Sequence, residues 1–144
     1  MKDSMKIEFE SKSSNEAFAR VAVTAFIAKL DPSISEVSEI KTAVSEAVTN
    51  SIIHGYRSKP GKIYISCGID NNQIEITVTD KGQGIDNIDR AREPLFTTNT
   101  DGQRSGMGFT VMETFMDDIA IKSLPGIGTK IVMRKILGEG VDFE

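Results

Sequence analysis

The sequence has one cysteine, one histidine and no long hydrophobic run, and these shortages exclude several classes of protein. Because Cys67 stands alone, no internal disulfide can form, which favours a reducing cytoplasm. The charged N-terminal residues have no apolar stretch behind them, so we expect no signal peptide. No run approaches the roughly 20 apolar residues that cross a bilayer, so we expect no membrane association.

Three common nucleotide-binding signatures are also missing. Gly126–Lys130 resembles a fragment of a phosphate loop, but its spacing is wrong and a strand is expected to follow it. The Gly-x-Gly pairs that begin at positions 82 and 106 lack the third glycine of a dinucleotide fingerprint. The His-Arg-Asp and Asp-Phe-Gly motifs of eukaryotic-type kinases are absent. A nucleotide enzyme with this sequence must therefore use another design.

Size and charge set further limits. A chain of 144 residues suits one compact domain, and we find no internal repeat, so residues 1–144 are predicted to form a single domain. The formal net charge of −4 argues against nucleic acid as a direct partner, because phosphate contacts favour a basic face. The same charge is compatible with a basic protein partner.

Hydrophobic periodicity predicts strands paired as hairpins, with helices inserted between them. The expected strands are 5–10, 63–69, 74–79, 119–123 and 129–136, and the expected helices are 16–30, 35–54, a short one after 85, and 108–116. This order predicts an α+β fold, a two-layer α/β sandwich whose mixed, mostly antiparallel sheet has helices on one face.

The first two helices have recognisable ends. Asn15 is expected to cap the first helix, Ser35 to open the second, and Gly55 to end the second. Five apolar residues of the first helix fall at helical spacing and are expected to face the core: Phe18, Val21, Ala22, Ala25 and Phe26.

The second helix places Glu46 and Asn50 one turn apart, with His54 one turn further, while Ser51 falls on the opposite, apolar face. A solvated polar face explains this pattern without any function. The chemistry offers a second interpretation. Asparagine is a poor helix former, so it would be present for its carbonyl oxygen, a suitable ligand for Mg²⁺. Glu46 would then act as a general base.

Asp80 to Gly84 directly follows an expected strand. An aspartate at a strand end presents a hydrogen-bond acceptor to a pocket, and an adenine amino group is a matching donor. Gly82 and Gly84 would allow the backbone to turn tightly and approach a flat base. Because Asp-x-Gly also marks ordinary turns, a turn without function is the simpler interpretation of this motif alone.

Two further glycine motifs lie nearer the C-terminus. Arg104 to Phe109 leads into an expected helix, where exposed backbone N–H groups and Arg104 would favour an anion such as phosphate. An ordinary glycine-rich loop explains this segment equally well. At Gly128-Thr129, a β-turn is the simpler interpretation, but the threonine hydroxyl could reach a bound base.

In this order, the four motifs resemble those of the GHKL superfamily of ATPases and kinases, which includes gyrase-type ATPases, heat-shock chaperones and sensor histidine kinases. The resemblance rests on Glu46 to Asn50 with His54-Gly55, Asp80 to Gly84, Gly106 to Gly108, and Gly128-Thr129. It implies a sheet-and-helix sandwich that binds ATP or ADP between its helices and a lid formed by residues 94–105.

Longer segments resemble the anti-sigma F factors of endospore-forming bacteria, and this likeness extends from Met5 to about Lys135. The segments are Ser45 to Asn50, Ile53 to Tyr56, Pro94 to Thr98, and Arg104 to Phe109. The resemblance implies a homodimer that holds a sporulation sigma factor inactive. It also implies a protein serine kinase that phosphorylates an anti-anti-sigma factor with ATP and Mg²⁺, while the unphosphorylated anti-anti-sigma factor frees the sigma factor.

Residues and resemblance together predict individual roles. Asn50 binds Mg²⁺, Glu46 acts as the base on the substrate serine, and Arg104 offsets charge on the phosphoryl group. The expected nucleotide-binding residues are Asn50, His54, Asp80, Gly82, Gly84, Ile85, Thr97, Thr98, Ser105, Gly106, Met107, Gly108, Phe109 and Thr129. We expect His54 to be structural or to line the pocket, since no dimerisation helix pair precedes it.

Partner surfaces are harder to predict. Arg20 lies away from the expected apolar face of the first helix, and a lone surface arginine is usually only solvated. Because the resemblance places this helix at dimer and partner surfaces, we expect Arg20 to contact a partner. Three rival functions remain: a sequestering module with ATP as a structural ligand, a detached histidine-kinase domain, and an ATP-hydrolysing clamp. Glu46 favours the kinase, because binding alone needs no base.

Overall fold

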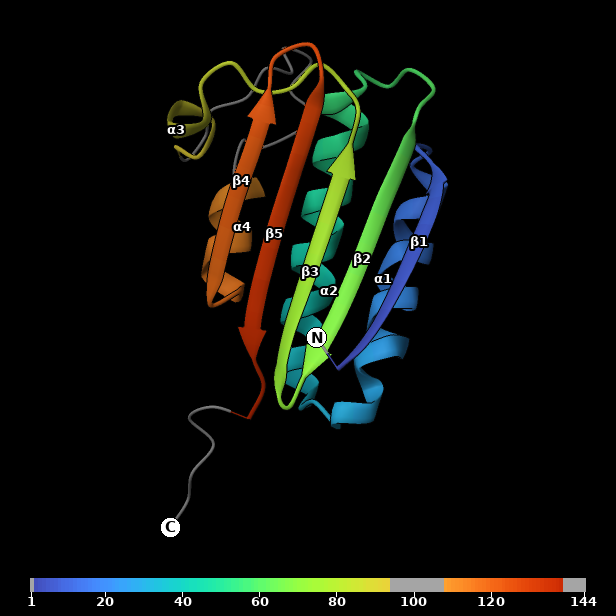
Figure 1. Cartoon of the computed structure of the whole chain (residues 1–144), viewed down its shortest axis with the longest axis vertical. Coiled ribbons are helices and arrows are strands. Elements are labelled where there is room, and N and C mark those ends of the chain that lie inside the picture. Colours follow the sequence, from blue (N-terminus) through green and yellow to red (C-terminus); the bar gives the residue numbers. More distant parts are fainter. Residues whose placement is uncertain (1, 94–107, 139–144) are drawn as a thin grey trace.

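The computed structural model describes residues 2–93 and 108–138, in which one sheet has helices packed on one face (Figure 1). The strands are β1 (Asp3–Glu10), β2 (Lys62–Asp70), β3 (Gln73–Asp80), β4 (Asp118–Leu124) and β5 (Gly128–Ile136). The helices are α1 (Ser14–Ile27), α2 (Ile34–Asn50), α3 (Ile88–Ala91) and α4 (Gly108–Phe115). A 3-10 turn, Ala28–Leu30, follows α1, and a π-helix, Ser51–Gly55, follows α2. Within the described ranges, no helix has the length and apolarity to span a bilayer.

The strands are ordered β1-β2-β3-β5-β4, and every described pairing is antiparallel. The expected hairpins β2–β3 and β4–β5 are both present, and the first turns through Asn71 with a φ of 56°. β5 lies between β3 and β4, so the strand that comes last in the described sequence occupies the interior of the sheet. The predicted two-layer α/β sandwich is confirmed.

The hydrophobic core lies between the sheet and helices α1, α2 and α4. Alternate residues of β2 and β3 are buried on the helical side, including Ile63, Ile65 and Ile76. Helix α2 lies against them with Ile40 and Val44, both fully buried. Each such side chain contributes roughly 1.5–3 kcal/mol relative to an exposed one. The packing fixes α2 against the sheet and thereby positions its C-terminal end.

The predicted cap of α1 was wrong, and so was most of its predicted core face, although Phe26 is partly buried and packs against the core as expected. The buried residues are Ala19, Val23 and Ile27, whereas Phe18 is 50% exposed, Val21 is 63% exposed, and Ala25 is also exposed. Apolar residues surround this helix, so its contacts with α2 and the sheet select the buried face. Asn15 lies inside the helix, where its side-chain amide donates to the Glu10 carbonyl at 2.9 Å, and Ser13 occupies the cap position.

The N-terminal cap of helix α2 lies two residues earlier in the sequence than expected. Ser33, not Ser35, is the cap: its hydroxyl accepts a hydrogen bond from the Glu36 amide, and the Glu36 carboxylate accepts one from the Ser33 amide. This reciprocal capping box satisfies two amides that would otherwise lack intrahelical partners. The helical segment ends at Gly55 as expected, but its last five residues form a π-helix.

Candidate functional site: a nucleotide pocket

Three segments far apart in the sequence meet at one end of the sheet, at the top of Figure 1. They are the π-helix after α2, the loop that follows β3, and the hairpin between β4 and β5. Hydrogen bonds join the loop to each of its neighbours. Three motifs of the sequence therefore come together in space: the end of the motif from Glu46 to Gly55, the Asp80 to Gly84 motif, and Gly128-Thr129.

Asp80 lies at the centre of this junction and is 3% exposed. Its carboxylate accepts a hydrogen bond from the Ser51 hydroxyl at 2.8 Å and another from the Gly82 amide at 2.9 Å. Burial raises the pKa of this carboxyl above its ordinary value of 3.8, while bonds from Gly82, Ser51 and the Thr129 amide partly offset that effect. The result is a rigidly oriented acceptor at the end of β3.

The two glycines of the Asp80–Gly84 loop have steric reasons to be glycine. A Cβ at Gly82 would lie 2.1 Å from the Gly55 carbonyl oxygen, so the loop and the π-helix could not stay in contact. Gly84 has a φ of 78°, in the left-handed region, and a Cβ there would lie 2.3 Å from the Leu124 carbonyl oxygen. The loop therefore depends on close backbone approach on both of its sides.

On the α2 side, Gln83 and Tyr56 attach the loop to the end of the helical segment. The Gln83 amide donates to the Gly55 carbonyl at 2.8 Å, and its side-chain amide donates to the His54 carbonyl at 2.7 Å. The Tyr56 hydroxyl accepts a bond from the Lys81 amide at 2.8 Å. His54 thus supports the loop through its backbone, in line with the structural role expected for it.

On the hairpin side, Ser123 makes the main connection. Its hydroxyl accepts from the Ile85 amide at 2.6 Å and lies 3.0 Å from the Thr129 hydroxyl. The amide of Gly126 donates to the Gln83 carbonyl at 2.6 Å. Thr129, which lies opposite Asp80, and Ile85, both expected at the nucleotide site, are therefore linked through Ser123.

Asn50 and Glu46 lie at the end of α2 nearest to this junction. Asn50 is the last residue of α2 and is 9% exposed, and Glu46 is half-buried one turn earlier. The described residues contain no cluster of three or more His, Cys, Asp or Glu side chains that could hold a metal. A buried amide oxygen still fits Mg²⁺, which needs few protein ligands when phosphates and waters supply the rest.

The other predicted site residues have different outcomes. Gly108 begins α4, and the Phe109 side chain is 7% exposed and packs in the hydrophobic core. Arg20 is on α1, where its guanidinium pairs with Glu16 at 2.7 Å without the alignment of a hydrogen bond. The remaining residues and the expected lid lie outside the described residues: Thr97, Thr98, Arg104, Ser105, Gly106 and Met107.

Four residues of the junction were not predicted as site residues: Ser51, Tyr56, Gln83 and Ser123. Ser51 was assigned to the apolar face of α2, and it is indeed buried, but its hydroxyl points to Asp80. A serine directly after Asn50 within an otherwise apolar stripe was the one available signal. The partners of Tyr56 and Ser123 depend on long-range contacts that no local pattern indicates.

Comparisons with known proteins agree with this geometry. A family model described as the histidine kinase-like ATPase domain matches residues 9–135. The anti-sigma F factor of Clostridium beijerinckii is 61% identical over 132 residues, covering 91% of this chain and 92% of that protein. The anti-sigma F factor of Oceanobacillus iheyensis is 55% identical over 140 residues, covering 96% of each.

Solved structures share the fold at low sequence identity. The RsbU and RsbW domains of Rv1364c from Mycobacterium tuberculosis align with a TM-score of 0.68 and 18% identity, covering 94% of this chain and 32% of that one. The catalytic domain of the histidine kinase ThkA aligns with a TM-score of 0.57 and 18% identity, covering 92% of this chain and 96% of that one. At such identity these likenesses concern the fold alone.

Proposed function

This chain belongs to the anti-sigma F factor family, built on the histidine kinase-like ATPase domain, and from that premise we propose that it is a protein serine kinase that uses Mg-ATP. Its substrate in this proposal is a serine of an anti-anti-sigma factor. The unphosphorylated anti-anti-sigma factor would free the sigma factor, and phosphorylation would prevent this. We propose that the chain acts in the cytoplasm as a single domain and a homodimer.

The observation that carries the nucleotide part of this proposal is the anchored Asp80 carboxylate. An adenine amino group would donate to this acceptor, whose orientation is fixed by Ser51 and Gly82. Gly82 lies so close to the Gly55 carbonyl that no side chain fits between them, and this contact holds the loop backbone against the π-helix beside Asp80. Thr129, held through Ser123, supplies a hydroxyl beside the same acceptor.

The transfer step uses the end of α2. The Glu46 carboxylate accepts the proton of the substrate serine hydroxyl, the serine oxygen forms a bond to the γ-phosphorus, and the bond from that phosphorus to the β–γ bridging oxygen breaks to release ADP. Mg²⁺, when bound through Asn50, would neutralise charge on the phosphates. Arg104 would balance charge on the transferred group. The chain's part is mainly to position the serine and the nucleotide.

The main rival is a sequestering module in which ATP is only a structural ligand, and Glu46 separates the two. The experiment mixes the protein with Mg²⁺, γ-labelled ATP and the anti-anti-sigma factor, and follows label into phosphoserine. Glu46→Gln should retain ATP binding and lose transfer. Glu10→Gln, a matched change at an exposed residue of β1, should transfer like the wild type. Tight ATP binding without any transfer by the wild type would establish the rival.

The homodimer is proposed at the face formed by β1 and the exposed side of α1. Phe18 and Val21 expose large apolar side chains there, and Phe18 contacts Phe9 of β1 edge to face, with ring centroids 6.0 Å apart. Exposed apolar patches of this kind are typical of interaction sites. Val21→Glu should convert a dimer to a monomer in analytical ultracentrifugation, and a dimer that persists in this variant would exclude the face.

A further inference from the structure

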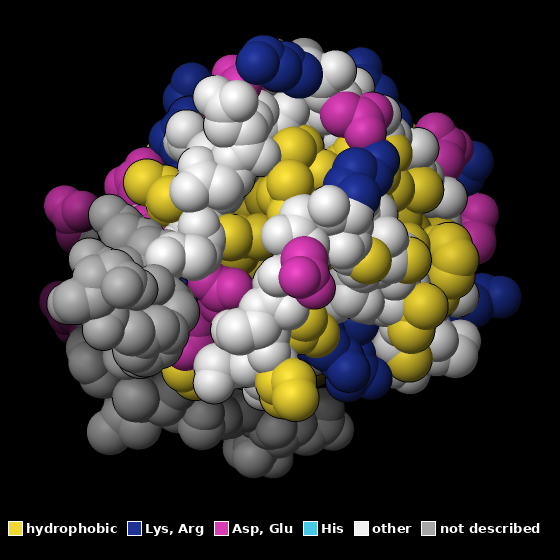
Figure 2. Space-filling view, turned by 90° about the horizontal axis from the view of Figure 1, so that it is seen from below, with side chains coloured by type: hydrophobic (Ala, Val, Ile, Leu, Met, Phe, Trp, Pro, Cys, Tyr) yellow, Lys and Arg dark blue, Asp and Glu magenta, His cyan; other side chains and the backbone are white. Residues whose placement is uncertain are grey.

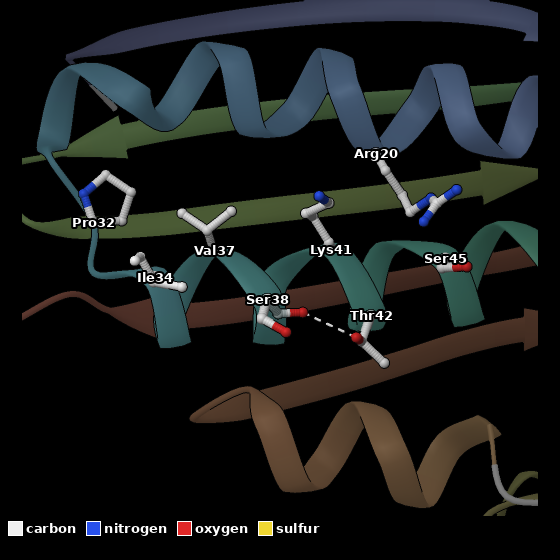
Figure 3. A pocket seen from close by; sticks show the side chains of 8 residues that line it. All are labelled: Arg20, Pro32, Ile34, Val37, Ser38, Lys41, Thr42 and Ser45. Carbon is white, nitrogen blue, oxygen red and sulfur yellow. Dashed lines mark hydrogen bonds between the residues drawn. The ribbon is translucent and has the colours of Figure 1, made fainter.

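A groove of about 470 Å³ runs between α1 and α2 on the helical side of the molecule (Figure 3). Its α2 wall consists of residues at helical spacing: Ile34, Val37, Ser38, Lys41, Thr42 and Ser45. Pro32 lies at one end and Arg20 of α1 reaches in at the other. The groove therefore follows α2 for about 16 Å, at 1.5 Å per residue from Ile34 to Ser45.

The groove combines an apolar end with two basic side chains, Lys41 and Arg20, of which Arg20 is paired with Glu16. Ile34 is 91% exposed at the start of α2, which is unusual for a large aliphatic side chain. Lys41 lies two turns further along and forms no ion pair with any residue of the described part. No acidic residue lines the groove, although the whole chain has a net charge of −4. Seen from below in Figure 2, this end of the molecule has hydrophobic side chains next to both basic and acidic side chains.

The groove begins at the end of α2 opposite to the nucleotide pocket. Asn50 lies 16 residues beyond Ile34, about 24 Å along the helix axis. A substrate serine must reach the γ-phosphate, so a segment seated near Ile34 and Lys41 is too far away to deliver it. A partner that is only held has no such requirement. The Ile34 end of the groove therefore favours the sequestered partner over the phosphorylated one, whereas the other end, at Ser45, lies next to Glu46.

We propose that this groove binds an acidic, amphipathic helix of the sigma factor, with an apolar side chain against Ile34 and Val37 and a carboxylate at Lys41. Ile34 and Lys41 are seven positions apart, about 10 Å along the helix, which matches an apolar residue and an acidic residue two turns apart on a partner helix. This inference rests on the anti-sigma role of the proposed function. It extends the expected partner contact at Arg20 along α2 toward Ile34.

The test measures sigma-factor affinity by surface plasmon resonance for the full chain and three variants. Lys41→Glu should raise the Kd at least about tenfold, because it places a like charge opposite the carboxylate. Ile34→Ala should raise the Kd about threefold to tenfold without lowering the thermal stability of the free protein, because this side chain is almost fully exposed. Lys122→Glu, the same charge reversal at an exposed residue of β4, should change the Kd less than about twofold.

The outcomes separate this proposal from the proposed function. Serine phosphorylation and ATP affinity should be unchanged in the Ile34 and Lys41 variants. If the wild type binds no sigma factor, the proposed function fails. If the wild type and both groove variants bind it equally, the groove proposal alone is overturned. It is also overturned if the variants instead weaken binding of the anti-anti-sigma factor, or if they change only the mass of the free protein, which would indicate a second copy of this chain.

Discussion

Removing the Ser51 hydroxyl should destabilise the fold by withdrawing one donor from the buried Asp80 carboxylate. Ser51 is 1% exposed, and its bond to Asp80 is 2.8 Å long. A hydrogen bond to a charged group contributes about 1.5–3 kcal/mol, and the better helix propensity of alanine returns about 0.5 kcal/mol. Ser51→Ala should therefore lower the free energy of unfolding by about 2 kcal/mol at neutral pH, or the Tm by roughly 6 °C.

The pH dependence of this loss has a defined sign. Because burial raises the pKa of Asp80 above 3.8, the folded state holds this proton more tightly than the unfolded state. The free energy of unfolding should therefore fall as pH rises from 3.8 through the raised pKa. Ser51→Ala removes a group that lowers this pKa, so the fall should continue to higher pH. At low pH, where the carboxyl is protonated in both states, the variant and the wild type should differ less.

Urea denaturation at about pH 7 and about pH 3 measures both effects. Ser45→Ala is the matched control, because it makes the same change on α2, the helix that directly precedes Ser51, at a half-buried residue away from Asp80. Its free energy of unfolding should stay within about 0.5 kcal/mol of the wild type. A Ser51 variant as stable as this control at both pH values would refute the argument that the Ser51–Asp80 bond holds the loop.

Three further perturbations test other parts of the structure. Gly82→Ala would bring a methyl group to 2.1 Å from the Gly55 carbonyl oxygen, so ATP affinity in equilibrium titration should fall at least about tenfold; unchanged affinity would contradict the close packing. Tyr56→Phe removes the acceptor of the Lys81 amide and should cost about 1–2 kcal/mol in urea denaturation, with no change expected if that bond is unimportant. Burial raises the pKa of the Cys67 thiol to about 12, so the native protein should resist thiol reagents at about pH 8 and react once unfolded; rapid native labelling would contradict this.

The sheet and the order of elements could be predicted from the sequence because each signal was local. The alternation of Ile63 to Ile69 and of Ile74 to Thr79 specifies two half-buried strands, and the polar residues between them specify a tight turn. The core face of α1 could not be predicted in the same way. Apolar residues lie on all sides of that helix, so contacts made after folding decide that Ala19 is buried and Phe18 is exposed.

The site was predictable where a motif marks it and unpredictable where it depends on distant partners. Asp80, Gly82 and Thr129 were recognised from their motifs, and the structure brings them together. Ser51 is separated from Asp80 by 29 positions and Tyr56 from Lys81 by 25, so no local pattern links them. The sequence therefore does not indicate which hydrogen-bond partners the Ser51 and Tyr56 hydroxyl groups have in the fold.

The position of β5 inside the sheet has a consequence for synthesis on the ribosome. Strand β4 pairs only with β5 among the described strands, so it has no place in the sheet until β5 has emerged from the exit tunnel. Thr129, whose amide is one of the donors to Asp80, belongs to the same late strand. The nascent chain can thus assemble β1, β2 and β3 early, but its pocket is completed only when translation has passed Ile136.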